Sequence, residues 1–92
     1  MRALRIHPED TVATVLADVE EGDEVTVISD DGKTLRAIVA TGAIPMAHKV
    51  SLEKTEVGEK IVKYGEVVGR ATHSIGKGAH VHTHNVESMR VR

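Results

Sequence analysis

Hydrophobic and polar residues alternate over several short stretches of the chain, a pattern typical of half-buried β-strands. The clearest example is a pair of stretches at residues 24–28 and 34–39, joined by a polar turn at residues 29–32, which predicts a β-hairpin with both arms half-buried. Val25 and Val27 would face one side of the first arm. In the second arm Leu35, Ala37 and Val39 would share a side.

Other strands are predicted on both sides of this hairpin. A short strand at residues 3–6 ends before Pro8, because proline cannot donate to a ladder. After a loop at residues 41–45, glycines divide the remaining chain into further predicted strands, at residues 48–52, 60–64, 66–71 and 80–91.

One segment has the period of a helix. Val12, Val15, Leu16 and Val19 recur at helical spacing, which predicts a helix over residues 11–19 with Asp10 as its N-cap and an end near residue 22. The predicted fold is therefore mainly β with one short N-terminal helix, and 92 residues are enough for a single domain spanning residues 1–92.

Composition limits the core and the classes of partner. With one Tyr and no Phe or Trp, the core must be built from Val, Ile, Leu, Ala and Met, so we expect modest stability and a benefit from a partner that covers apolar surface. The net charge of −2 argues against nucleic-acid binding. The lack of cysteine excludes disulfides and thiolate sites, and no apolar run approaches the roughly 20 residues of a membrane span. A cytoplasmic location without membrane contact is the expectation.

The densest group of chemically useful side chains lies at residues 80–85. His80, His82 and His84 alternate, so on an extended strand they would line one face with about 7 Å between successive Cα atoms. Two of them could bind a divalent metal with a ligand from elsewhere, and a looped backbone would let all three converge. The alternative is an exposed polar face or hydrogen-bonded structural histidines. Asn85 could likewise fix a turn or present its amide to a ligand.

Two other pairs combine a cation with a ring. His48 and Lys49 would suit a carboxylate, although a lysine at a strand end is often only solvated edge protection. Tyr64, next to Lys63, could donate to a substrate oxygen or fill the core with its hydroxyl in water. No serine or acid forms a recognisable catalytic arrangement, so we expect the domain to lend a few groups to a larger active site.

Three motifs together resemble a known family. Residues 48–52 (HKVSL), 62–71 (VKYGEVVGRA) and 78–86 (GAHVHTHNV) are similar, in order and spacing, to the small amino-terminal domain of altronate and galactarate dehydratases, and the resemblance extends to the opening segment at residues 6–13. It implies a SAF-type domain with a β-clip fold, either fused to a large catalytic domain or encoded as a small subunit.

The resemblance also implies an activity. Family members remove water from a sugar acid to give a 2-keto-3-deoxy acid with the help of a divalent metal, usually iron (Fe²⁺), expected to be held mainly by the large subunit. The residues that match the family motifs then become site candidates. They are His82 and His84 for catalysis, His80, His82 and His84 for the metal, and His48, Lys49, Lys63, Tyr64 and Asn85 for the substrate.

The expected partners are a large dehydratase subunit and a sugar acid. Assembly into a homo-oligomer is a further possibility. Two alternatives also remain. One is the small subunit of a (2R)-sulfolactate sulfo-lyase, whose substrate also places a carboxylate beside a hydroxyl. The other is a non-catalytic SAF module for carbohydrate binding or assembly.

Overall fold

The computed structural model describes residues 1–89, which form nine β-strands and no helix. Accordingly, none of these residues belongs to a membrane-spanning helix. The strands are β1 (Arg2–Arg5), β2 (Val12–Val15), β3 (Glu24–Ser29), β4 (Thr34–Val39), β5 (Lys49–Ser51), β6 (Lys60–Lys63), β7 (Glu66–Ala71), β8 (His80–Val81) and β9 (Val86–Ser88).

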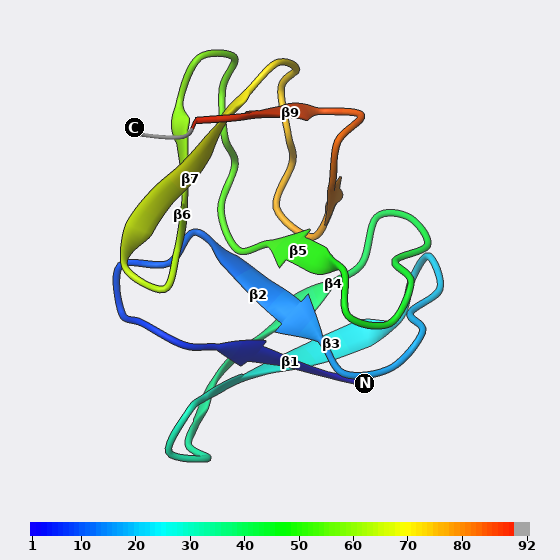
Figure 1. The fold of residues 1–92 in the computed structure, drawn as a ribbon. Coiled ribbons are helices and arrows are strands. Elements are labelled where there is room, and N and C mark those ends of the chain that lie inside the picture. The colour runs from blue at the N-terminus through cyan, green and yellow to red at the C-terminus, as the bar shows by residue number, and fades with distance from the viewer. Residues whose placement is uncertain (90–92) are drawn as a thin grey trace.

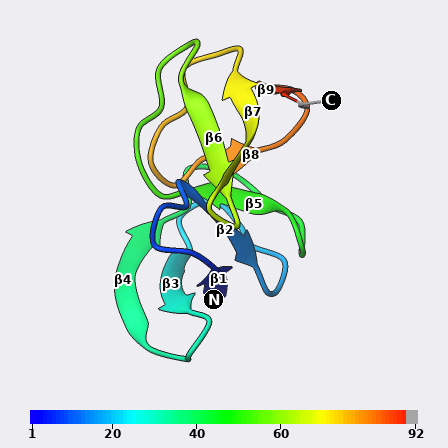
Figure 2. The same cartoon turned by 60° about the vertical axis from the view of Figure 1, so that its left-hand side comes forward.

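The strands form two sheets in a small β-sandwich-like domain (Figures 1 and 2). The larger sheet has the order β4-β3-β1-β2-β5-β8, in which only β1 and β3 run parallel. The smaller sheet has the order β6-β7-β9 and lies on one side of the molecule, with β2 and β5 between it and the β1-β3-β4 part. The mainly β part of the prediction is confirmed, and the β-clip designation stays a prediction.

The predicted helix at residues 11–19 is wrong, because this segment begins as strand β2. Val12 packs in one hydrophobic cluster while Ala13 and Val15 pack in another, so β2 buries both of its faces. Leu16, which helical spacing placed on the buried stripe, is 43% exposed. The helical period thus arose from a strand with two buried faces, and the β-branched residues of the segment favour that strand.

The hairpin of β3 and β4 is confirmed, with a register shift between Val27 and Ile28. Leu35, Ala37 and Val39, which were predicted to share a side of the second arm, all lie on its exposed face, and β4 buries Ile38 on the opposite face. Strand β4 is also an edge strand of the larger sheet.

The predicted strand at residues 80–91 is two short strands, β8 and β9, with a turn between them. Its last predicted residues, 90 and 91, lie outside the described range. Strand β6 ends one residue earlier than predicted, because Tyr64 and Gly65 form the two-residue turn to β7 with φ values of 58° and 73°. Positive φ at both central residues is the requirement of a type I′ hairpin turn.

Two hydrophobic clusters form the core. The larger lies on the six-stranded sheet and includes Ala3, Val25, Val27 and Val50. The smaller joins the two sheets through Val12, Ile61, Ala71, Ile75 and Val81. Aliphatic side chains fill both clusters, as predicted, but the methionines do not contribute: Met1, Met46 and Met89 are exposed.

Candidate functional site

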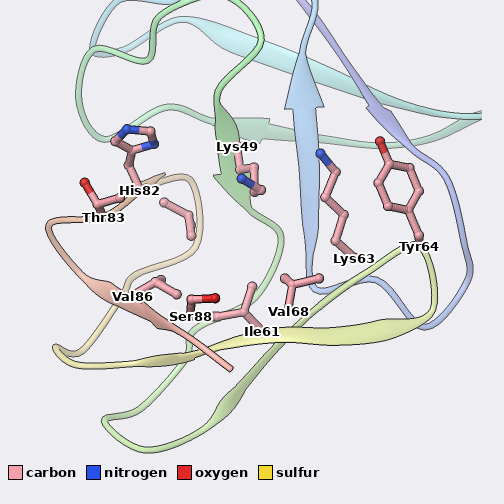
Figure 3. Close-up of a pocket in the computed structure, with 10 residues that line it drawn as sticks. Lys49, Ile61, Lys63, Tyr64, Val68, His82, Thr83, Val86 and Ser88 are labelled. Carbon is pink, nitrogen blue, oxygen red and sulfur yellow. The ribbon is translucent and has the colours of Figure 1, made fainter. Parts of the chain in front are cut away.

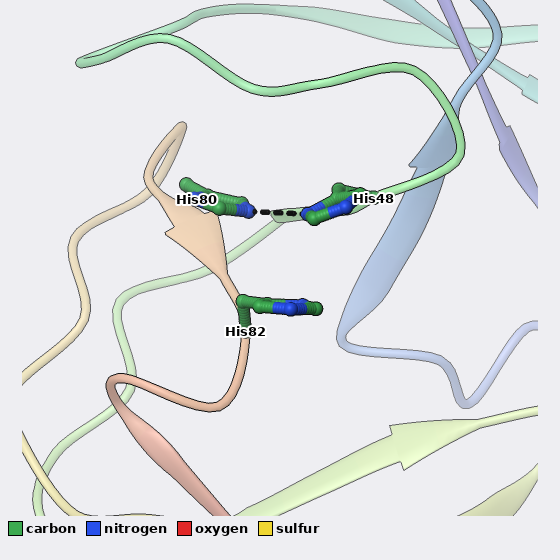
Figure 4. Close-up of side chains that lie close together, drawn as sticks. All are labelled: His48, His80 and His82. Atoms are coloured by element: carbon green, nitrogen blue, oxygen red, sulfur yellow. Dashed lines mark hydrogen bonds between the residues drawn. The ribbon is translucent and has the colours of Figure 1, made fainter.

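The pairing of β5 with β8 brings three histidines together (Figure 4). Lys49 lies opposite Val81, and Val50 lies opposite His80. Continuing this antiparallel register by one residue places His48 opposite His82. Since alternate residues share a face, His48, His80 and His82 lie on the same side of this two-stranded ribbon. We call these three residues the histidine trio.

The imidazoles of the trio converge closely enough to share one ion. Each offers a ring nitrogen, and these three atoms lie within 4.8 Å of one another. Nδ1 of His48 and Nε2 of His80 form a hydrogen bond of 2.8 Å, and the rings of His48 and His82 stack with centroids 4.3 Å apart. His48 and His80 are half-buried while His82 is exposed, so the group opens toward solvent on the side of His82.

His84 lies beside the histidine trio but outside it. Its ring centroid is 5.1 Å from that of His80 on a tilted plane, and His84 does not belong to the group of nitrogens that converge. The chain turns after Val81, so the histidines do not follow one straight strand. The sequence predicted a metal set of His80, His82 and His84, whereas the ring nitrogens that converge belong to His48, His80 and His82. Metal binding itself stays a prediction.

The surroundings of His80 favour its neutral form. Burial lowers the pKa of His80 below its ordinary value of 6.5, and positive charge on His84, His48, His82 and Lys49 lowers it further. Neutral imidazole is the form that binds a metal, so this environment favours ligation over protonation.

Asn85 is buried in the turn of residues 82–85, which we call the histidine turn. Its side-chain amide bonds to the backbone of His80 and of His82. This geometry is that of the turn-forming alternative, and any influence of Asn85 on a substrate would pass through the loop.

A cleft of about 380 Å³ lies between the two sheets next to the trio (Figure 3). His82 belongs to both features. The apolar residues that line the cleft are Ile61, Val68, Val81 and Val86, which we call its apolar floor. Its polar lining consists of Lys49, Lys63, Tyr64, His82, Thr83 and Ser88. The cleft therefore collects Lys49, Lys63 and Tyr64, which the sequence placed in two separate motifs.

The lysines give this cleft a positive character. Burial lowers the pKa of Lys49, and the nearby charge of Lys63 lowers it further. Among the described residues that line the cleft, none is an aspartate or glutamate, and within residues 1–89 neither lysine forms an ion pair. Lys63 Nζ lies 4.9 Å from the centroid of the Tyr64 ring, and Tyr64 is 58% exposed at the cleft rim. An anion entering the cleft would relieve the repulsion between the two lysines.

Sequence reasoning missed two parts of this site. It treated His48 only as a substrate contact, and the signal that joins it to the trio is the β5–β8 register, which links residues about 30 positions apart. It also missed the apolar floor. The sequence pattern indicates only that Ile61, Val68, Val81 and Val86 belong to strands, and it carries no sign that they line a cleft.

Comparison with known proteins identifies the family. The sequence-family model described as the altronate/galactarate dehydratase SAF domain matches residues 1–89. The chain is 41% identical over 88 residues to altronate dehydratase of Escherichia coli, covering 96% of this chain but only 17% of that enzyme. The chain thus spans about a sixth of the length of that relative.

Two smaller relatives match over most of their own length. The chain is 37% identical over 84 residues to the alpha subunit of (2R)-sulfolactate sulfo-lyase from Chromohalobacter salexigens, covering 88% of that subunit. It is 36% identical over 64 residues to the same subunit from Paracoccus pantotrophus, covering 94% of it. All three relatives are lyases or parts of lyases, and the chain belongs to the SAF-domain family of altronate and galactarate dehydratases.

Proposed function

We propose that this domain completes the active site of a metal-dependent hydro-lyase that dehydrates a sugar acid of the altronate or galactarate type to a 2-keto-3-deoxy acid. The observation that carries the proposal is the position of His82, which belongs both to the histidine trio and to the lysine-lined cleft. A metal held by the trio would thus lie beside an anion held in the cleft.

The donor set fits a divalent metal. Imidazole suits iron, zinc, copper and nickel, and three protein ligands leave positions open for substrate oxygens. Two ligands about 2.1 Å from one ion and at a right angle are about 3 Å apart, close to the 2.8 Å between His48 Nδ1 and His80 Nε2. Small ring movements would bring His82 to the same distance. Iron (Fe²⁺) is the metal that we propose, with further ligands from a larger catalytic unit.

The cleft fits the acid end of the substrate. Lys49 and Lys63 would bind its carboxylate, and a bound carboxylate would raise the pKa of Lys49 toward its ordinary value by offsetting the charge of Lys63. Tyr64, Thr83 and Ser88 offer hydroxyls to the polyol part.

Dehydration requires a base for the proton next to the carboxylate and an acid for the departing hydroxyl. When bound, the metal would supply Lewis-acid polarisation of the carboxylate and hydroxyl oxygens. The trio would hold it beside the cleft, the lysines would orient the carboxylate, and His84 at the edge of the trio is the candidate for moving a proton. The remaining acid–base groups would come from the larger unit.

We further propose that the domain works as the small subunit of a two-chain cytoplasmic enzyme. The support is its match to sulfo-lyase alpha subunits over most of their length. The match covers 17% of altronate dehydratase of Escherichia coli. That enzyme would represent the other arrangement, in which the domain is one part of a longer chain.

A second candidate function is the small subunit of a (2R)-sulfolactate sulfo-lyase. The observation that favours it is the similarity to the two relatives named as that subunit. The two functions differ in the leaving group, which is water for the sugar acids and sulfite for sulfolactate.

The test is reconstitution with the large lyase chain from the same source and assay with altronate, galactarate and sulfolactate. We expect turnover of one sugar acid that depends on both chains and on Fe²⁺, and a loss of well over tenfold with His82→Ala. His73→Ala, which alters an exposed histidine outside the site, is the control. Turnover of sulfolactate alone would select the second function. Unchanged turnover without this domain would instead support a non-catalytic module.

A further inference from the structure

The side chain of Asn85 bonds to the backbone of two members of the histidine trio, His80 and His82. Its Oδ1 accepts a hydrogen bond from the backbone N–H of His82 at 3.0 Å, and its Nδ2 donates to the backbone carbonyl of His80 at 2.8 Å. The residue is 8% exposed. Each end of the amide therefore fixes the backbone of one metal-ligand candidate.

The backbone of Asn85 ties the same turn to the rest of the fold. Its N–H donates to the carbonyl of His82 at 3.1 Å, which closes a turn over residues 82–85, and its carbonyl accepts from the N–H of Thr72 at 2.9 Å. Thr72 directly follows β7, so the turn is anchored to the smaller sheet. On its other side, His80 is held by its pairing with Val50 in the larger sheet.

These bonds have a direct consequence for the imidazoles. The side chains of His80 and His82 leave the backbone at the two places that Asn85 holds. In the turn their rings stack with centroids 5.5 Å apart and an interplanar angle of 11°, and His82 also reaches to 4.3 Å from His48. The convergence of the trio thus depends on the backbone shape that Asn85 holds.

We infer that Asn85 is a positioning residue of the histidine trio, and that it supports metal affinity by fixing the separation of His80 and His82. This inference rests on the metal site of the proposed function. Outer residues that orient metal ligands contribute about 10–100-fold to metal affinity. Asn85 acts through the loop and contacts neither substrate nor metal.

Two substitutions separate this role from a general effect on folding. Asn85→Ala removes both side-chain bonds. Asn85→Asp keeps the shape and the acceptor for His82 N–H but replaces the donor to His80 with an oxygen that repels its carbonyl. Val25→Ala is the control, because it weakens the larger hydrophobic cluster, of which no member belongs to the histidine turn.

The probe is Co²⁺, titrated into the chain and followed by its visible absorption bands. We expect both Asn85 variants to bind Co²⁺ about 10–100-fold more weakly, with altered bands, and Val25→Ala to retain the affinity and spectrum of the parent despite a lower melting temperature. Equal affinity in the parent and in both Asn85 variants would overturn the inference.

A second measurement needs no metal. In the metal-free chain, NMR contacts between the rings of His48 and His82 should be lost in both Asn85 variants and kept in Val25→Ala. Contacts that persist in the Asn85 variants would overturn the positioning role even if the metal site is real. A parent that binds no Co²⁺, but loses these contacts on substitution, would reject the proposed metal site and leave the positioning role standing.

Discussion

The carboxylate of Asp10 accepts a hydrogen bond at 2.8 Å from the backbone N–H of Gly65, 55 positions along the chain. Its other oxygen accepts from the N–H of His7 at 3.1 Å, and the residue is 7% exposed. Asp10 therefore connects the β1–β2 loop to the β6–β7 turn. Because Tyr64 is part of this turn and Lys63 precedes it, the contact also fixes one wall of the cleft.

Asp10→Ala should lower the free energy of unfolding by about 1–3 kcal/mol, because it leaves two backbone donors without their acceptors. Urea denaturation measures this loss. Tyr64 is the only aromatic residue, so its fluorescence anisotropy should also fall if the turn is released. Asp30→Ala removes the same charge from an exposed turn and should change stability by less than about 0.5 kcal/mol. Equal stabilities of the two variants would contradict the structural role of Asp10.

Gly69→Ala should destabilise the smaller sheet. A Cβ atom at Gly69 would lie 2.5 Å from Cγ1 of Val86 and 2.8 Å from the carbonyl oxygen of Glu87, so β9 would have to move away from β7. Such overpacking costs about 1–3 kcal/mol. Gly42→Ala is the matched control, because nothing lies within 4 Å of the added Cβ. Thermal melts that show equal effects of the two substitutions would argue against the close approach of β7 and β9.

Local patterns in the sequence predicted most strands, because alternation and glycine turns act over a few residues. The failure at residues 11–19 has a physical cause: Val12 and Val15 lie on opposite faces of β2 and pack in different clusters. Spacing alone cannot distinguish a strand buried on two faces from one stripe of a helix. In β4, both faces carry apolar residues, and only the packing of the core decides that Ile38 is buried and Leu35 is exposed.

The candidate site could be predicted only in part for a related reason. The run of histidines at residues 80–84 was visible, but the partner of His80 is set by long-range pairing of β5 with β8. The turn that replaces a straight strand depends on the amide of Asn85, for which the sequence left two roles open. Motifs located the residues, whereas register and turn geometry decided which of them converge.

The metal-free chain should lose stability as the pH falls below 6.5. The pKa of His80 is lowered by burial and by His84, His48, His82 and Lys49, so the unfolded chain takes up a proton at higher pH than the folded chain does. The contribution of neutral His80 is complete above 6.5 and is lost as the pH falls toward the lowered pKa. Urea denaturation across this range should show a weaker pH dependence for His80→Gln than for the parent. His73→Gln should follow the parent, and an identical slope in all three proteins would contradict the prediction.

His48 and His84 should differ in their effect on metal binding, although sequence alone favours His84. His48 Nδ1 lies 2.8 Å from His80 Nε2 within the converging group, while His84 lies outside it. His48→Ala should therefore abolish stoichiometric Fe²⁺ or Co²⁺ binding, measured by calorimetry under anaerobic conditions, because two imidazoles form a weak site. His84→Ala should keep the stoichiometry and remove one positive neighbour of His80, which raises the pKa of His80 toward its ordinary value. If His84→Ala abolishes binding and His48→Ala does not, the metal is held by the consecutive histidines of the loop, and the β5–β8 register is not what assembles the site.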